Sequence, residues 1–267
     1  MEELYVFGTG NAQAVHCYNT CFAIREGDGF FMVDAGGGNG ILRILEDMDV
    51  DLCRIHNIFV THEHTDHILG IVWMVRMIAT AMRKGRYEGE LRIYCHQGLV
   101  DTISTICRLT MQAKFYKMIG SRIFLVPVED GETVRIMDYD VTFFDILSTK
   151  ARQFGFTTIL KNGRRFTCAG DEPYNPECRP YVEGSDWLLH EAFCLYRDRE
   201  IFEPYEKHHS TVKEACELAE SLRIPNLVLW HTEDKDLAQR KKLYTAEGRE
   251  YYHRNLLVPE DGEIIAL

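Results

Sequence analysis

Three histidines and one aspartate lie within six positions of one short segment of the chain. They are His62, His64, Asp66 and His67. Imidazole nitrogens and carboxylate oxygens are ligands that suit zinc, and also manganese or iron. A lone buried histidine is more often a core residue with satisfied hydrogen bonds, but burying four titratable groups together without a partner would cost several kcal/mol. The segment therefore predicts a metal site.

A strand and a helix must hold this segment. Residues 57–60 form a short apolar, partly β-branched run, as in a buried strand, and residues 68–82 are apolar with one arginine and no proline, as in a buried helix. The segment is thus expected on a strand-to-helix loop. Such a loop lets the first two histidines approach one cation, while the aspartate and the last histidine, at the helix start, approach a second.

Other residues with metal-binding or acid–base side chains also follow predicted strands. A strand over 165–169 is followed by Gly170-Asp171, one over 186–189 by His190-Glu191, and one over 227–230 by His231. Because these side chains all lie just past strand ends, we expect a single edge of the fold to collect them.

The other predicted elements alternate between strand-rich and helical stretches. Asn162-Gly163 is a strong hairpin signal, and Thr211 with Glu214 is placed for a helix capping box. We also expect strands over 5–7, 20–24, 30–33, 91–94, 123–128, 133–136, 141–147, 154–160 and 263–266, and helices over 41–48, 99–118 and 237–252. Two strand-rich halves, each followed by helices, predict an α/β fold, a four-layer αββα sandwich, formed by residues 1–267 as one domain.

The turn Asp34-Ala35-Gly36-Gly37-Gly38 follows the strand over 30–33. We reject a phosphate-binding loop because no Lys-Ser or Lys-Thr follows the glycines. Backbone that passes close beneath a metal centre, where a side chain would not fit, explains the glycines better.

Composition limits the class of protein. With 267 residues, 46% of them apolar, the chain can bury a sizeable core, and its net charge of −11 argues against a broad nucleic-acid-binding surface. Nine scattered cysteines, without a secretory signal peptide, predict reduced thiols in the cytoplasm. The apolar run after His67 contains Arg76 and is too short to cross a bilayer, so no membrane partner is expected.

With these positions in hand, the chain resembles the metallo-β-lactamase superfamily, and it looks most like the tRNA 3′-processing endonucleases of the ribonuclease Z type. The resemblance covers nearly the whole chain. The matching segments are Gly8-Thr9-Gly10, Asp34-Ala35-Gly36, the His-x-His-x-Asp-His motif from His62 to His67, Gly170-Asp171, His190-Glu191-Ala192, His209-Ser210-Thr211 and His231.

Two departures from the family pattern stand out. The third metal histidine of the family falls on Thr149, so one ligand is missing and occupancy by a single metal ion becomes plausible. His96, His16 and His208 are the candidates to replace it. The family also inserts a Gly-Pro-rich arm that clasps tRNA, and here a hairpin fills the interval from Gly155 to Asp171. The activity on tRNA is therefore not expected to accompany the fold.

The ligand types separate this chain from some relatives. Two-iron oxidoreductases of the fold carry glutamate where His64 stands, and true β-lactamases generally carry cysteine where Asp171 stands. Lactonases and glyoxalase-type thioesterases share the ligand set and stay open.

The resemblance implies a hydrolase in which one or two ions, zinc or alternatively manganese or iron, activate a water that attacks a phosphodiester. Asp66 would also hold the proton of the nucleophile, His209 would stabilise the developing charge or protonate the leaving oxygen, and Glu191 would orient His209. For His190 and Glu191 a structural role is almost as well favoured. The implied metal ligands are His62, His64, Asp66, His67, Asp171 and His231.

Two alternatives remain beside the phosphodiesterase: a thioesterase or lactonase of the same fold, and a non-catalytic metal-binding protein with a degenerate site. The expected substrate is a small molecule or nucleotide. Nucleic acid is not favoured, although the basic turn from Lys161 to Arg165 leaves a local groove open. The resemblance also implies a homodimer. No role is assigned to His16, His56, His96, His208 or His253.

Overall fold

The computed structural model describes residues 2–267, and its contacts divide the chain into two compact units. The first unit holds the chain up to Gly8, Tyr18–Glu129 and Asp261–Leu267, and the second holds Thr9–Cys17 and Asp130–Glu260. Each unit contains one seven-stranded mixed sheet. The assignment of residues 1–267 to one domain stays a prediction.

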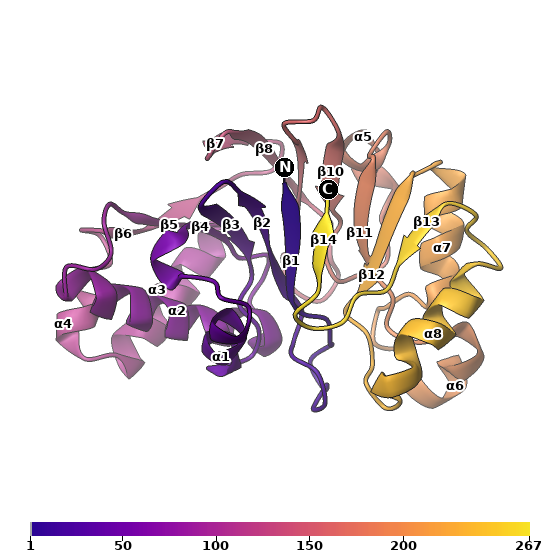
Figure 1. Ribbon diagram of the computed structural model, residues 1–267, viewed down its shortest axis with the longest axis horizontal. Helices are drawn as coiled ribbons and strands as arrows, with labels where there is room; N and C mark the ends of the chain where they lie inside the picture. Colours follow the sequence, from indigo (N-terminus) through magenta and orange to yellow (C-terminus); the bar gives the residue numbers. More distant parts are fainter. Residues whose placement is uncertain (1) are drawn as a thin grey trace. The chain divides into compact units, whose positions relative to one another are not determined.

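The sheet of the first unit has the order β14-β1-β2-β3-β4-β5-β6. Strands β3 to β6 run parallel, whereas β14, β1, β2 and β3 pair antiparallel, and β14 forms one edge, as expected for the last strand. The chain ends beside its own start, because β14 pairs with β1 (Figure 1). The strands are β1 (Glu3–Gly8), β2 (Cys21–Glu26), β3 (Gly29–Val33), β4 (Ile55–Phe59), β5 (Leu91–Cys95), β6 (Ile123–Pro127) and β14 (Ile264–Ala266).

Helices cover one face of this sheet (Figure 1). Alternate strand residues, such as Phe7, Ala23 and Met32, point into a core that they share with the apolar side of α2. The helical elements are α1 (Gly40–Asp47), η1 (Leu52–Arg54), α2 (Thr65–Arg83), α3 (Gln97–Thr110) and α4 (Ala113–Tyr116).

The sheet of the second unit has the order β13-β12-β11-β10-β9-β8-β7. Strands β10 to β13 run parallel, and β9 and β10 form the expected hairpin around Asn162-Gly163. The strands are β7 (Thr133–Ile136), β8 (Tyr139–Asp145), β9 (Phe154–Ile159), β10 (Arg165–Cys168), β11 (Trp187–Glu191), β12 (Asn226–Trp230) and β13 (Asn255–Leu257).

In the second unit, α7 packs on β11 and β12, and α8 contacts β13 (Figure 1). The predicted capping box is present at the start of α7, where Glu214 accepts hydrogen bonds from Thr211. The helical elements are η2 (Pro176–Cys178), α5 (Arg179–Val182), η3 (Tyr196–Asp198), α6 (Arg199–Phe202), α7 (Val212–Ser221) and α8 (Leu237–Gly248). Two mixed sheets with flanking helices confirm the predicted α/β fold class.

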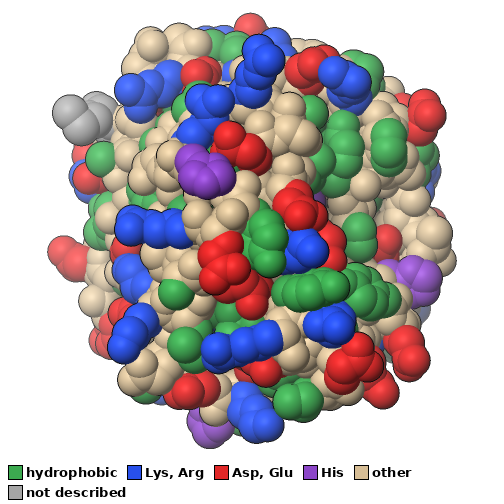
Figure 2. Space-filling view, turned by 90° about the vertical axis from the view of Figure 1, so that its right-hand side faces the viewer, with side chains coloured by type: hydrophobic (Ala, Val, Ile, Leu, Met, Phe, Trp, Pro, Cys, Tyr) green, Lys and Arg blue, Asp and Glu red, His purple; other side chains and the backbone are tan. Residues whose placement is uncertain are grey.

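Charged side chains of both signs are interleaved on the face of the protein shown in Figure 2. This view shows no broad basic area. The phosphate backbone of a nucleic acid would therefore meet attractive and repulsive side chains next to one another on this face, in keeping with the net charge of −11.

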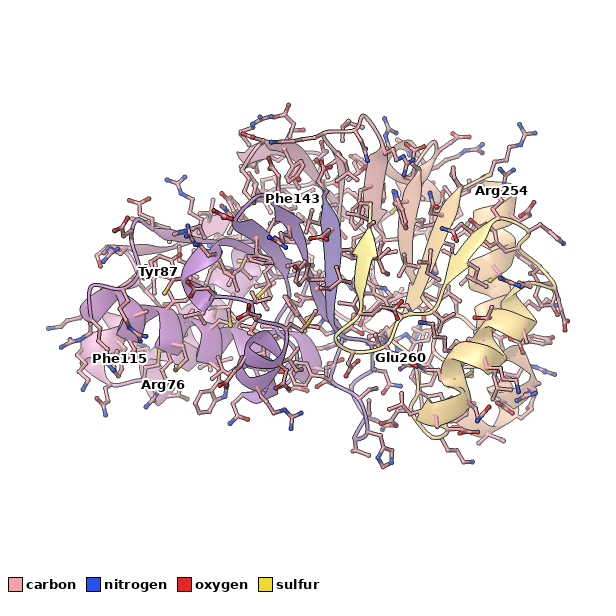
Figure 3. All side chains as sticks on the ribbon, viewed as in Figure 1. Arg76, Tyr87, Phe115, Phe143, Arg254 and Glu260 are labelled. Carbon is pink, nitrogen blue, oxygen red and sulfur yellow. The ribbon has the colours of Figure 1, made fainter. Side chains whose placement is uncertain are left out.

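The single helix expected over 99–118 is wrong. The chain leaves helical geometry at Met111 and Gln112, whose ψ angles are 151° and 141°, so α3 and α4 are separate. Neither glycine nor proline marks the break. It is explained by packing, since Met111 is buried in the core and the Arg76 guanidinium lies 5.7 Å from the centre of the Phe115 ring (Figure 3). Tertiary contacts here outweigh helix propensity.

Two element ends also differ from expectation. Helix α8 ends at Gly248 instead of residue 252. A Cβ atom on Gly248 would lie 2.6 Å from Leu256 Cδ2, so neighbouring side chains pack directly on the helix backbone there. Strand β11 continues through His190 and Glu191, which pair with Leu229 and Trp230 of β12. These two residues therefore lie inside a strand and not past its end.

All nine cysteines are free within the described residues 2–267, in keeping with the predicted reduced thiols. Burial raises the pKa of Cys95, Cys107, Cys194 and Cys216 to about 12, so these side chains are neutral thiols at neutral pH. In the same part of the chain, none of the helices combines the length and the apolar character needed to cross a membrane.

Helix α2 lies against the turn after β3 at a glycine. Gly70 donates its amide hydrogen to Gly36 O at 2.8 Å, and a Cβ atom added to Gly70 would lie 1.8 Å from Ala35 O. We expect Gly70→Ala to push the helix off the turn and to lower the free energy of unfolding by about 3 kcal/mol. Denaturant unfolding measures this loss.

Gly38→Ala is the matched control, because a Cβ atom there meets no atom within 4 Å. It should change the free energy of unfolding by less than about 0.5 kcal/mol. Equal stability of the two variants would contradict the close approach of α2 to the turn.

Thiol labelling tests the burial of the cysteines. In the folded protein at neutral pH we expect iodoacetamide to modify only Cys17 and Cys53, which are half-buried, because the thiolate is the reactive form and the other seven side chains are buried. Mass spectrometry of peptides identifies the sites, and unfolded protein, in which all nine should react, is the control. Rapid labelling of Cys95 or Cys216 in the folded state would contradict the packing of either unit.

Candidate functional site

The predicted metal-binding segment lies between β4 and α2 in the first unit. His62 is in the loop, His64 is the N-cap of α2, and Asp66 and His67 belong to its first turn. His62 Nε2 lies 2.8 Å from His64 Nδ1, and His67 Nε2 lies 3.3 Å from Asp66 Oδ2. The His62 and His67 ring centres are 4.1 Å apart, so the structure brings the four side chains together in one cluster. Which of them share a cation stays a prediction.

Asp34, directly after β3, organises this segment. Its carboxylate is buried and accepts three hydrogen bonds: from the Thr61 backbone amide at 2.8 Å, from Thr61 Oγ1 at 2.7 Å and from His67 Nδ1 at 2.7 Å. A buried carboxylate needs such donors to offset its desolvation. Asp34 therefore holds the start of the loop and the start of α2 together.

These hydrogen bonds also determine where the imidazole protons lie. His67 Nδ1 donates a hydrogen bond to Asp34. The Thr61 hydroxyl also donates to Asp34, and its Oγ1 therefore accepts from His62 Nδ1 at 2.9 Å. The lone pairs of His62 and His67 are consequently on Nε2. Histidine ligands in metal sites are oriented in the same way, by an oxygen acceptor for the other ring nitrogen.

The sequence did not predict this role of Asp34. It showed the residue only as part of the Asp34-Ala35-Gly36 segment that the resembled family shares. The available signal was a carboxylate directly after a buried strand. Its φ angle of 54° shows how sharply the chain turns there. The glycines that follow do run beside the metal-binding segment, because a Cβ atom on Gly37 would lie 3.6 Å from Asp66 Cα.

The second unit carries the other predicted ligands after two parallel strands. Asp171 follows β10, His231 follows β12, and both are buried. Asp171 Oδ2 lies 3.4 Å from His231 Nε2. Like Asp34, His231 has a positive φ angle, here 54°, where the chain leaves the strand. The amide of the next residue, Thr232, donates to Thr9 O at 2.9 Å and so anchors the turn.

The predicted acid–base pair also lies in the second unit. Glu191 is fully buried in β11, and its Oε2 lies 3.6 Å from His209 Nδ1, while its Oε1 accepts from the Ser210 amide. The His209 ring stacks on Phe193, with 4.8 Å between ring centres, and lies 5.1 Å from the His231 ring. His209 is thus fixed beside a ligand candidate and a carboxylate. Although it lies just before the start of α7, the His209 side chain is buried.

His190 points to the other side of its strand from Glu191. Its Nδ1 lies 2.7 Å from Glu191 O, so Nδ1 donates and Nε2 carries the lone pair. The ring lines a cavity of about 240 Å³ with His209 and Tyr174. Its burial in β11 supports the structural alternative for this residue.

Of the three histidines considered as replacements for the missing ligand, one contacts Thr149. His208 Nδ1 lies 3.2 Å from Thr149 Oγ1. His96 is buried, with its Nε2 3.5 Å from Glu63 Oε2, and His16 is exposed, with its backbone amide bonded to Asp234.

Comparisons with known proteins agree with this architecture. The metallo-beta-lactamase fold protein YhfI from Bacillus subtilis is similar over 98% of both chains, with a TM-score of 0.79 and 15% sequence identity. Human tRNase Z, short form, is similar over 99% of this chain and 98% of its own, with a TM-score of 0.74 and 21% identity. Ribonuclease Z from Thermococcus sibiricus is 22% identical over 317 residues, covering 100% of this chain and 97% of the relative.

The predicted metallo-β-lactamase fold and the likeness to ribonuclease Z are therefore confirmed. A family model is more specific: the one described as Anti-Pycsar protein Apyc1 matches residues 2–263. Since this match spans nearly the whole chain, the protein belongs to the Apyc1 family and has the metallo-β-lactamase fold.

Proposed function

We propose that the protein is a metal-dependent hydrolase that cleaves a phosphodiester in a small-molecule or nucleotide substrate. The observation that carries this proposal is the pair of imidazoles whose Nδ1 protons are engaged by Thr61 and Asp34, which places the lone pair of each ring on Nε2, as in oriented histidine ligands. At His62 a bound cation would replace the 2.8 Å contact between Nε2 and His64 Nδ1. The ribonuclease Z relatives and the confirmed fold support the reaction class.

The proposed ligands are nitrogen and carboxylate donors that fit zinc, with manganese and iron as alternatives. We assign one or two ions to His62, His64, Asp66, His67, Asp171 and His231. When bound, the cation supplies a water whose pKa is lowered to near neutrality and a positive charge for the phosphoryl oxygens.

Side chains of the protein carry out the proton transfers of the proposed reaction. Asp66 accepts the proton of the attacking water, and His209 protonates the leaving oxygen. Stacking on Phe193 restricts the His209 ring, and the Glu191 carboxylate, 3.6 Å from Nδ1, orients it. Asp171 would be shared by both ions if two were held.

We do not extend the proposal to tRNA. Between Gly155 and Asp171 the chain forms the β9–β10 hairpin and a short turn, so the arm of the resembled enzymes has no counterpart in this interval. Two further parts of the proposal, a homodimer and a location in the cytoplasm, rest on the resemblance and on the cysteine pattern.

Hydrolysis of bis(p-nitrophenyl) phosphate tests the proposal. We expect activity that is lost after chelation and restored by zinc, manganese or iron, because the attacking water depends on the cation. With an alkyl phosphodiester such as a dinucleotide, whose leaving alkoxide needs a proton, His209→Gln should lower kcat by about 100-fold or more. His253→Gln, at an exposed histidine of the same unit, is the control.

Either of two outcomes would contradict the proposal and favour one of the alternatives. Protein that holds less than one ion per chain and shows no hydrolysis with any of the three metals would be a binding protein with a degenerate site. Hydrolysis restricted to thioesters or lactones would identify the alternative enzyme class.

Metal affinity tests the part played by Asp34. In Asp34→Asn the amide cannot accept as strongly from His67 Nδ1, so the ring loses its orientation, and we expect an affinity about 10–100-fold weaker. Competition with a chromophoric chelator measures it. Asp47→Asn, at an exposed position on α1, should leave the affinity unchanged. Equal affinity in the Asp34 variant would mean that the metal does not use His67.

A further inference from the structure

The position of the missing ligand is occupied by a threonine that contacts a histidine from a distant part of the chain. Thr149 Oγ1 and His208 Nδ1 are 3.2 Å apart, although 59 positions separate the residues. A neutral hydroxyl is a poor ligand for zinc, whereas an imidazole is a good one. The contact therefore places a better ligand beside the position where the sequence has lost one.

The segment around Thr149 is held from two sides. Ser148 Oγ donates to Glu172 Oε1 at 2.7 Å, directly after the ligand candidate Asp171. Lys150 Nζ lies 3.5 Å from Glu172 Oε1 and donates to Lys207 O at 3.1 Å. These contacts tie the residues next to Asp171 to the turn that carries His208.

The chemistry of the His208 ring suits coordination. When Nδ1 donates to Thr149 Oγ1, the lone pair lies on Nε2, the arrangement that oriented histidine ligands show. Within residues 2–267 the ring makes no other hydrogen bond or ion pair, and the side chain is exposed. The φ angle of His208 is 55°, a backbone conformation that costs energy for any residue with a Cβ atom, and such strain is concentrated at functional sites.

We propose that His208 replaces the missing third histidine as a metal ligand, and that Thr149 has become the residue that orients its ring. The inference rests on the metal-binding function proposed above. It places the new ligand next to His209 in the chain, so that one turn would supply both a ligand and the proton donor.

Metal content and affinity test the inference without reference to activity. The variants are His208→Ala and His208→Ala combined with Thr149→His, which returns an imidazole to the position used by the resembled family. Ions per chain are measured by inductively coupled plasma mass spectrometry after dialysis against a weak chelator, and affinity by competition. Absorption of the cobalt-substituted protein reports the change of a nitrogen ligand directly.

We expect His208→Ala to weaken the binding of one ion by about 100-fold or more, because a direct ligand contributes at least as much as the outer residues that orient it. The double variant should recover at least a tenth of the wild-type affinity. His253→Ala, at an exposed histidine in the same unit, should match the wild type, and circular dichroism should show that all variants are folded.

The outcomes separate the two proposals. If the wild type and His208→Ala hold the same number of ions with equal affinity, His208 is not a ligand, while the metal-dependent function stands. If the wild type itself holds less than one ion per chain, both proposals are wrong. Weaker binding in His208→Ala without recovery in the double variant would also overturn the replacement, because it would indicate that the turn and not the ligand had been lost.

Discussion

The metal-binding segment depends on one buried carboxylate. Asp34 accepts hydrogen bonds from the Thr61 backbone, the Thr61 hydroxyl and the His67 ring, and so joins the end of β3, the loop after β4 and the start of α2. Because the carboxylate is desolvated, each of these bonds is difficult to replace with water. The same contacts determine the tautomers of two histidines. The metal chemistry proposed for this loop therefore depends on the hydrogen bonds that Asp34 accepts.

Strand ends supply the other ligand candidates. Parallel strands bring their carboxyl ends to one edge of a sheet, and in each unit the ligand candidates follow such strands. The chain must then turn sharply, as the positive φ angles of Asp34 and His231 show. Both conformations are costly for residues with a Cβ atom, and the surrounding hydrogen bonds offset the cost. The strained backbone at these two residues is therefore the energetic cost of placing their side chains at the proposed site.

The departure at Thr149 shows why a ligand set is not a list of sequence positions. A metal site requires donor atoms of the right type at the right distance, whichever residue carries them. In our proposal, a threonine that holds a histidine from another turn meets this requirement in place of a histidine at the original position. The confirmed family and fold restrict the chemistry, but the substrate is decided by the residues around the site.

Several features followed from sequence alone because their causes are local. The His62–His67 spacing on a strand-to-helix loop, the Asn162-Gly163 hairpin and the capping box of α7 each depend on residues within a few positions of one another. The α/β fold class followed from the order of apolar runs. The metal ligands themselves stay a prediction.

Only the tertiary structure decided the rest. The break between α3 and α4 carries no glycine or proline and follows from the burial of Met111. Asp34 and Thr61 are 27 positions apart, and Thr149 and His208 are 59 apart. No periodicity or local propensity encodes such contacts, because they form only when the completed sheets bring distant turns together. Their energy depends on burial, which is a property of the whole fold.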